Sequence, residues 1–142
     1  MWSKEFSIDT DARPEVILQL FADVGHWPEW NAGTEWVELD GPFAAGTHAR
    51  MKIPAEAPFP FRLIAVDEHG FEDETPIPDA GVVVRVRHSV EPLGNGRTRI
   101  VYRATVDGAM ADELGGEIGQ QVTADFPDVL RALAARAAAS RA

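Results

Sequence analysis

The sequence predicts an α+β fold in which a curved antiparallel sheet of about seven strands wraps round a long C-terminal helix, with two short helices after the first strand. Apolar and polar side chains alternate with period two over residues 2–8 and through most of residues 34–106, which indicates half-buried strands. Apolar side chains recur at helical spacing after the first strand and again over residues 109–139. The 142 residues suit a single domain spanning residues 1–142.

The first strand leads into the two short helices. Residues 2–8 carry their large apolar side chains on one parity, as a half-buried strand does. A helix is expected to begin near Pro14, because proline is tolerated in the first helical turn, where its missing N–H is not needed. Gly25 and Pro28 interrupt the helical pattern, so residues 24–30 are predicted to form a second short helix or a turn.

The middle of the chain is predicted to be β structure. The expected strands cover residues 34–40, 47–53, 61–67, 71–77, 82–90 and 98–106. Prolines make residues 54–60 a loop or a sheet edge, because proline cannot donate a hydrogen bond to a neighbouring strand.

The clearest hairpin joins residues 82–90 to residues 98–106 through a Gly-Asn-Gly turn. A register that pairs Val90 with Ile100 places His88 opposite Tyr102. The same parity turns the valines and His88 toward the long helix and turns Arg85 and Arg87 toward water. Arginines at the opposite parity are therefore predicted to lie on a solvated face.

The C-terminal segment predicts one long amphipathic helix from Ala109 to about Ala139. Its apolar stripe comprises Leu114, Ile118, Val122 and Phe126, which follow one another at steps of four and are expected to form the helical wall of a cavity. Pro127 predicts a kink, or a break just before it. The alanine-rich tail after Leu133 is hardly amphipathic and is expected to fray.

Composition excludes several function classes. Thirteen basic residues face 23 acidic ones, for a net charge of −10, so no nucleic-acid partner is expected. The chain contains no cysteine and no apolar run of the ~20 residues that a membrane span requires. The N-terminus lacks the apolar segment of a signal peptide, so a soluble, cytoplasmic protein is expected. The four histidines show no metal-ligand spacing, and neither a metal nor a cofactor is predicted.

His88 and Tyr102 are the candidate polar groups of an otherwise apolar wall. One interpretation makes His88 a hydrogen-bonded core residue, and the other makes it a cavity-facing group that orients a ligand or transfers a proton. Asp73 shares its parity with Phe71 and would point inward too. A buried carboxylate then needs His88, an arginine or a ligand donor, and Arg62 has the wrong parity for that role.

Seven segments taken together resemble the polyketide cyclase/dehydrase-like branch of the START-like, or SRPBCC, superfamily, which has the helix-grip fold. These segments are Asp23–Asn31, Glu38–Thr47, Phe71–Thr75, Arg87–Pro92, Gly94–Thr98, Asp107–Gly108 and the final helix with Asp125–Pro127. The Trp-Pro-Glu-Trp motif at residues 27–30 and the Leu-Asp-Gly-Pro-Phe turn at residues 39–43 are the most specific. The resemblance implies a START-like ligand-binding domain with an internal cavity, and it implies no particular reaction.

Three functions remain open at this point. The first is a binding or carrier protein for a lipid-, quinone- or polyketide-like molecule. The second is a polyketide cyclase, dehydrase or aromatase that uses His88 and Tyr102, with Asp73 as a further candidate, for proton transfer. The third is a protein-interaction module with a vestigial cavity. The expected ligand-lining residues are Trp30, Met51, Phe61, Phe71, Asp73, His88, Tyr102, Leu114, Ile118, Val122 and Phe126. The oligomeric state is left open.

Overall fold

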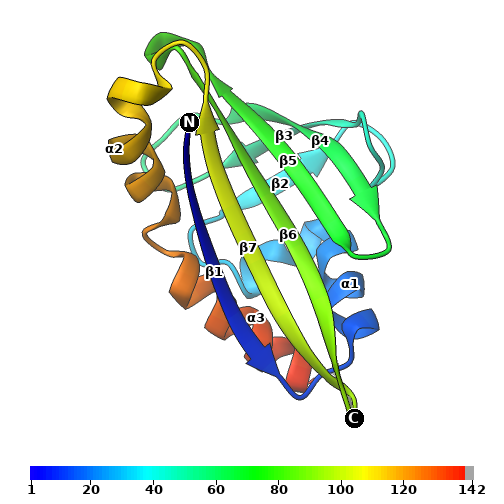
Figure 1. Cartoon of the computed structure of the whole chain (residues 1–142). Coiled ribbons are helices and arrows are strands. Elements are labelled where there is room, and N and C mark those ends of the chain that lie inside the picture. The colour runs from blue at the N-terminus through cyan, green and yellow to red at the C-terminus, as the bar shows by residue number, and fades with distance from the viewer. Residues whose placement is uncertain (140–142) are drawn as a thin grey trace.

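The fold, described here for residues 1–139 of a computed structural model, is one seven-stranded antiparallel sheet that curves round two consecutive C-terminal helices (Figure 1). The strands lie in the order β1-β7-β6-β5-β4-β3-β2, so the first and last strands of the chain are neighbours. Their bounds are β1 Trp2–Thr10, β2 Trp36–Leu39, β3 His48–Lys52, β4 Phe59–Asp67, β5 Gly70–Ile77, β6 Val82–Gly94 and β7 Arg97–Asp107. This arrangement confirms the predicted α+β helix-grip architecture.

Short helical segments complete the chain. The α-helix α1 and the 3₁₀ helix η1 follow β1 as predicted, and a 3₁₀ turn, η2, connects β5 to β6. Their bounds are α1 Pro14–Ala22, η1 Val24–Glu29, η2 Pro78–Ala80, α2 Ala111–Thr123 and α3 Phe126–Ala139. In Figure 1, α1 and α3 lie near one end of the curved sheet and α2 near the other.

The β6–β7 hairpin has the predicted register. Val90 lies opposite Ile100 and His88 lies opposite Tyr102. On the outer face, Arg85 donates to Glu74 at 2.8 Å and Arg87 donates to a carboxylate oxygen of β4, also at 2.8 Å. The arginines of the hairpin therefore point away from the helices, and the inner face is left to the valines, His88 and Tyr102.

The predicted break in the C-terminal helix lies just before Pro127. Helix α2 ends at Thr123, and α3 begins at Phe126. Pro127 thus occupies the first turn of α3, where no intrahelical partner for its missing N–H is required. The break separates α2, which packs on the β6–β7 end of the inner face, from α3, which packs between β1 and α1.

Helix α2 contacts the sheet through small side chains, which corrects the predicted wall of large ones. Its buried positions are Ala111, Gly115, Gly119 and Thr123, whereas Leu114, Ile118 and Val122 are only half buried. The reason is the position of Trp2, since a Cβ built on Gly119 would lie 2.4 Å from the Trp2 ring. Small residues let the helix approach that indole closely. The large apolar side chains of α2 therefore lie to one side of the contact between the helix and Trp2.

The alanine-rich part of α3 is more amphipathic than its composition suggests. Ala134 and Ala137 are buried, and the Thr10 hydroxyl donates to the carbonyl oxygen of Ala134 at 3.3 Å. The helix is continuous to Ala139, so the predicted weak packing after Leu133 was wrong for residues 134–139. Residues 140–142, where fraying was also expected, lie outside the described residues.

Candidate functional site

The candidate site is built from three neighbouring strands whose inner faces carry aromatic rings. The register of β5, β6 and β7 places Phe71 next to His88 and His88 next to Tyr102. The rings of Phe71 and His88 stack with centroids 4.1 Å apart, and the ring of Tyr102 meets that of His88 edge-on at 4.5 Å. The structure therefore brings together the two polar residues that the hairpin pattern had paired.

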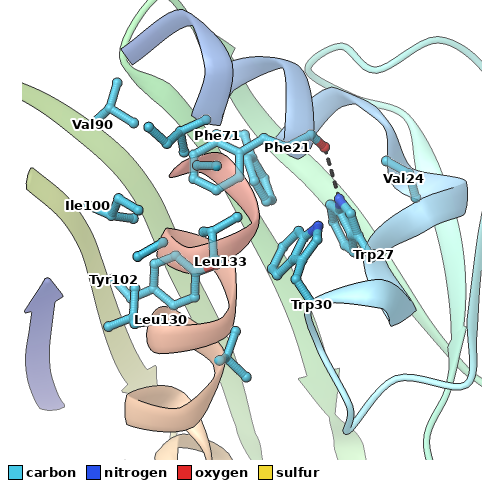
Figure 2. Close-up of a cluster of buried hydrophobic side chains, with 14 of the residues drawn as sticks. Phe21, Val24, Trp27, Trp30, Phe71, Val90, Ile100, Tyr102, Leu130 and Leu133 are labelled. Carbon is cyan, nitrogen blue, oxygen red and sulfur yellow. Dashed lines mark hydrogen bonds between the residues drawn. The ribbon is translucent and has the colours of Figure 1, made fainter. Parts of the chain in front are cut away.

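Further aromatic residues enclose this stack. From the helices, Phe126 packs edge-on against Tyr102 with centroids 5.5 Å apart, and Phe21 packs against Phe71 at 5.1 Å. Trp27 stacks on Phe71 and joins Trp30 to the cluster (Figure 2). His88 thus lies within an almost entirely apolar enclosure.

Three polar atoms inside this enclosure have no hydrogen-bond partner. They are Nδ1 of His88, the hydroxyl oxygen of Tyr102 and Nε1 of Trp30. The indole of Trp27, by contrast, donates to the carbonyl oxygen of Phe21 at 3.0 Å (Figure 2). A buried polar group without a partner destabilises the folded state by ~1–3 kcal/mol, so these atoms mark the place where a polar ligand atom would be stabilised.

Asp73 lies on the same inner face and has no basic partner. It is placed between Leu63 of β4 and Val86 of β6, and the one nearby arginine of β4, Arg62, points outward to Glu74 as predicted. Burial, and next the charge of Glu72, raise the pKa of Asp73 to about 7. Its carboxyl group is therefore largely protonated below neutral pH.

The other two ionisable groups of the inner face are also neutral. Burial lowers the pKa of His88 to about 3, so its imidazole carries no charge near pH 7. Burial, followed by the charges of Asp73 and Asp125, raises the pKa of Tyr102 well above its usual range. The site accordingly presents a carboxyl, an imidazole and a phenol, which can each donate or accept a hydrogen bond.

Asp125 is a residue that the sequence reasoning missed as a candidate for the site. It occupies the break between α2 and α3, burial raises its pKa, and its charge acts on Tyr102. Its carboxylate lies where a Cβ on Gly33 would come within 2.8 Å of Oδ2. The available signal was its position immediately before Phe126-Pro127, where the helix was expected to break.

The remaining predicted lining residues are divided between two apolar clusters. Trp30 and Phe61 are buried in the cluster that surrounds the ring stack, and Met51 packs against it. Ile118 and Val122 pack on the valines of β6 in the second cluster, and Phe126 contacts both clusters. Leu114 is half buried and belongs to neither cluster.

A hollow of about 140 Å³ lies between η1 and the start of α3. Trp30, Gly33, Asp125 and Val129 are among the residues that line it. The acidic residues Asp125 and Asp128 both line this hollow, whereas His88 and Tyr102 do not. A second hollow of about 170 Å³ lies between Phe6 on β1 and Leu130 on α3.

Two further findings limit the chemistry of the described residues. Within residues 1–139, no group of three or more acidic or histidine side chains is placed to hold a metal ion. None of the helices in that range is both long and apolar enough to cross a membrane.

A curved sheet closed by a long, bent C-terminal helix, with two short helices after the first strand, defines the helix-grip class of proteins. The chain belongs to the family described as polyketide cyclase/dehydrase and lipid transport, whose model matches residues 1–138. A search of curated protein sequences found no match.

Solved structures with the same fold include a norcoclaurine synthase and a di-domain ARO/CYC protein. Norcoclaurine synthase from Thalictrum flavum, in complex with dopamine and hydroxybenzaldehyde, superposes with a TM-score of 0.76 at 18% identity, covering 99% of this chain and 88% of the other. The di-domain ARO/CYC protein BexL of the BE-7585A biosynthetic pathway gives a TM-score of 0.75 at 19% identity, covering 94% and 45%. A protein from Thermobifida fusca gives 0.73 at 23% identity, covering 96% and 93%. These likenesses establish the fold.

Proposed function

We propose that the protein binds and carries a small aromatic or otherwise hydrophobic molecule between its sheet and its C-terminal helices. The observation that carries the proposal is the pair of unpartnered polar atoms on His88 and Tyr102 inside an aromatic enclosure. A few polar groups in an apolar lining are typical of small-molecule sites. A ligand oxygen placed there would offset the free energy lost by burying those atoms.

A fold neighbour supports the same class of ligand. Norcoclaurine synthase is similar in fold and was solved with two single-ring aromatic molecules, dopamine and hydroxybenzaldehyde. The hollow beside Trp30 is separate from His88 and Tyr102 and gives no support to this class of ligand. A protein whose interior served only to present an interaction surface would gain nothing from unpartnered polar atoms in its core, so the interaction module is the weaker hypothesis.

The test is a titration with 4-hydroxybenzaldehyde, followed by the ¹H–¹⁵N signals of the tryptophan indoles. The wild-type protein should show saturable shifts. Tyr102→Phe should weaken binding ~5–100-fold, since one hydrogen bond is left unmade. Without ligand, the same variant should be at least as stable as wild type, because its hydroxyl has no partner to lose.

Thr98→Val is the matched control on the same strand. Its buried hydroxyl donates to the carbonyl oxygen of Ala12 at 2.7 Å, so removing it should lower the free energy of unfolding by ~1 kcal/mol while binding persists. Absence of saturable shifts in wild type, or equal affinities for wild type and Tyr102→Phe, would contradict the proposal.

A second candidate function, proton transfer in a cyclase or dehydrase, is favoured by one observation. Asp73, with its pKa near 7, faces the same interior as the neutral His88. A group with a pKa near the working pH is suited to general acid–base catalysis. A β-diketone probe in D₂O tests this, because a catalytic base would accelerate exchange of the hydrogen between its carbonyls. Exchange at the uncatalysed rate, or acceleration that persists in Asp73→Asn and His88→Phe, would exclude this role.

A further inference from the structure

The basic side chains of the strands are segregated from the candidate site. Arginines on β3, β4, β6 and β7 have the parity of the outer face, and most are ion-paired there with acidic neighbours. The recorded pairs are Arg50–Glu38, Arg62–Glu74, Arg85–Glu74, Arg87–Asp67, Arg97–Asp11 and Arg99–Asp9. Lys4 of β1 has the inner parity, but it is exposed and its Nζ lies over the Phe6 ring at the sheet edge. No strand cation of the described chain therefore faces His88 and Tyr102.

A ligand carboxylate brought to this place would lose its hydration without gaining a cation. His88 supplies none, because burial keeps its imidazole neutral near pH 7. The carboxyl group of Asp73, which ionises with a pKa of about 7 on the same inner face, would add repulsion. Burying an uncompensated charge is far more costly than burying a neutral hydrogen-bonding group.

A purely apolar ligand would not resolve the unpartnered atoms either. Nδ1 of His88 and the hydroxyl of Tyr102 would stay without partners, since a hydrocarbon neither donates nor accepts. A hydroxyl group does both, and the rings that carry the two unpartnered atoms are direct neighbours, with centroids 4.5 Å apart.

We propose that the ligand of this site ends in an uncharged hydroxyl, as a phenol does, and that His88 and Tyr102 select this group against carboxylates and hydrocarbons. The inference rests on the proposed binding function and specifies its ligand class. It separates this chain from a carrier of free fatty acids, whose carboxylate would find no cation on the inner face of the sheet.

Three probes that differ only at one end of a para-methyl benzene ring test the inference at pH 6.5. They are 4-methylphenol, 4-methylbenzoate and p-xylene. Dissociation constants come from ¹H–¹⁵N NMR titrations of the whole chain, with the indole of Trp27, already bonded to a carbonyl, as an internal reference for Trp30. We expect 4-methylphenol to bind at least fivefold more tightly than p-xylene and at least tenfold more tightly than 4-methylbenzoate.

The same titrations on variants assign the selection to residues. His88→Phe and Tyr102→Phe should bring the affinity for 4-methylphenol to within twofold of that for p-xylene, while Thr98→Val keeps the wild-type ranking. Equal or tighter binding of 4-methylbenzoate or p-xylene would overturn the hydroxyl selectivity and leave the binding function standing. Failure of all three probes to bind would overturn both proposals.

Discussion

Asp73 and His88 are expected to give the stability of the protein two opposing dependences on pH. The folded-state pKa of Asp73 is about 7, against an ordinary value of 3.8. Between those values the folded chain holds a proton that the unfolded chain has released, so this residue makes stability fall as pH rises. The folded-state pKa of His88 is about 3, against 6.5. The unfolded chain then holds the extra proton, so His88 makes stability rise with pH over its own window.

The two windows overlap, and the magnitudes are nearly equal. Each fully developed difference of one proton changes the free energy of unfolding by about 1.4 kcal/mol per pH unit. From pH 5 to pH 6 each residue contributes about 1 kcal/mol, with opposite signs. The contributions nearly cancel in the wild-type protein, so removing either group should reveal the effect of the other.

Urea denaturation of wild type, Asp73→Asn and His88→Phe at several pH values from 5 to 8 measures this directly. Relative to wild type, Asp73→Asn should gain about 1 kcal/mol between pH 5 and pH 6 and keep gaining up to pH 7, whereas His88→Phe should lose about 1 kcal/mol over the first interval. Asp79→Asn removes a charge at an exposed position of η2 and serves as the control. Stability curves of the two interior variants that run parallel to the wild-type curve would refute the inward placement of these side chains.

Two further predictions concern α2. Gly119→Ala should lower the free energy of unfolding by ~1–3 kcal/mol, because its Cβ would overlap the Trp2 ring. Gly116→Ala, whose Cβ would lie 3.9 Å from the same indole, should raise the free energy of unfolding by ~0.5–1 kcal/mol, because alanine has the higher helix propensity. Equal effects of the two variants in thermal unfolding would contradict this packing. Val122 is a half-buried residue of the apolar stripe on α2, and Val122→Trp should lower the free energy of unfolding by less than the ~1–3 kcal/mol typical of an overpacked core. The same variant should weaken ligand binding. A full loss of ~1–3 kcal/mol with unchanged ligand affinity would place Val122 outside the site.

The parts of the fold that follow from local periodicity were predictable. The β6–β7 hairpin is the clearest case, since a shift of one residue would have turned its five arginines inward and the valines outward. The break before Pro127 followed in the same way from the geometry of a single residue. In both places the local pattern and the tertiary fold favour the same arrangement, so the sequence alone was sufficient.

The packing of α2 was not predictable from its own pattern. The apolar stripe from Leu114 to Phe126 suggested that large side chains face the sheet. A pattern of apolar side chains gives no signal at glycine, so it could not indicate that the glycines make the contact. The decisive partner is Trp2, more than a hundred residues away in the chain, whose indole occupies the space that Gly115 and Gly119 leave open. A helix face made of small residues becomes meaningful only once the opposing side chain is known.

The candidate site illustrates the same limit in electrostatic terms. Parity was enough to place Asp73, His88 and Tyr102 on one face, yet parity does not say whether a buried polar atom has a partner. That depends on the outward direction of Arg62, on the ring stack of Phe71 and on the break that holds Asp125. Because those three features come from different elements, only the folded chain shows that, in its described part, unpartnered polar atoms lie on the inner face while Arg62 points away from them. This combination, more than any single residue, is the basis for proposing an uncharged hydrogen-bonding ligand.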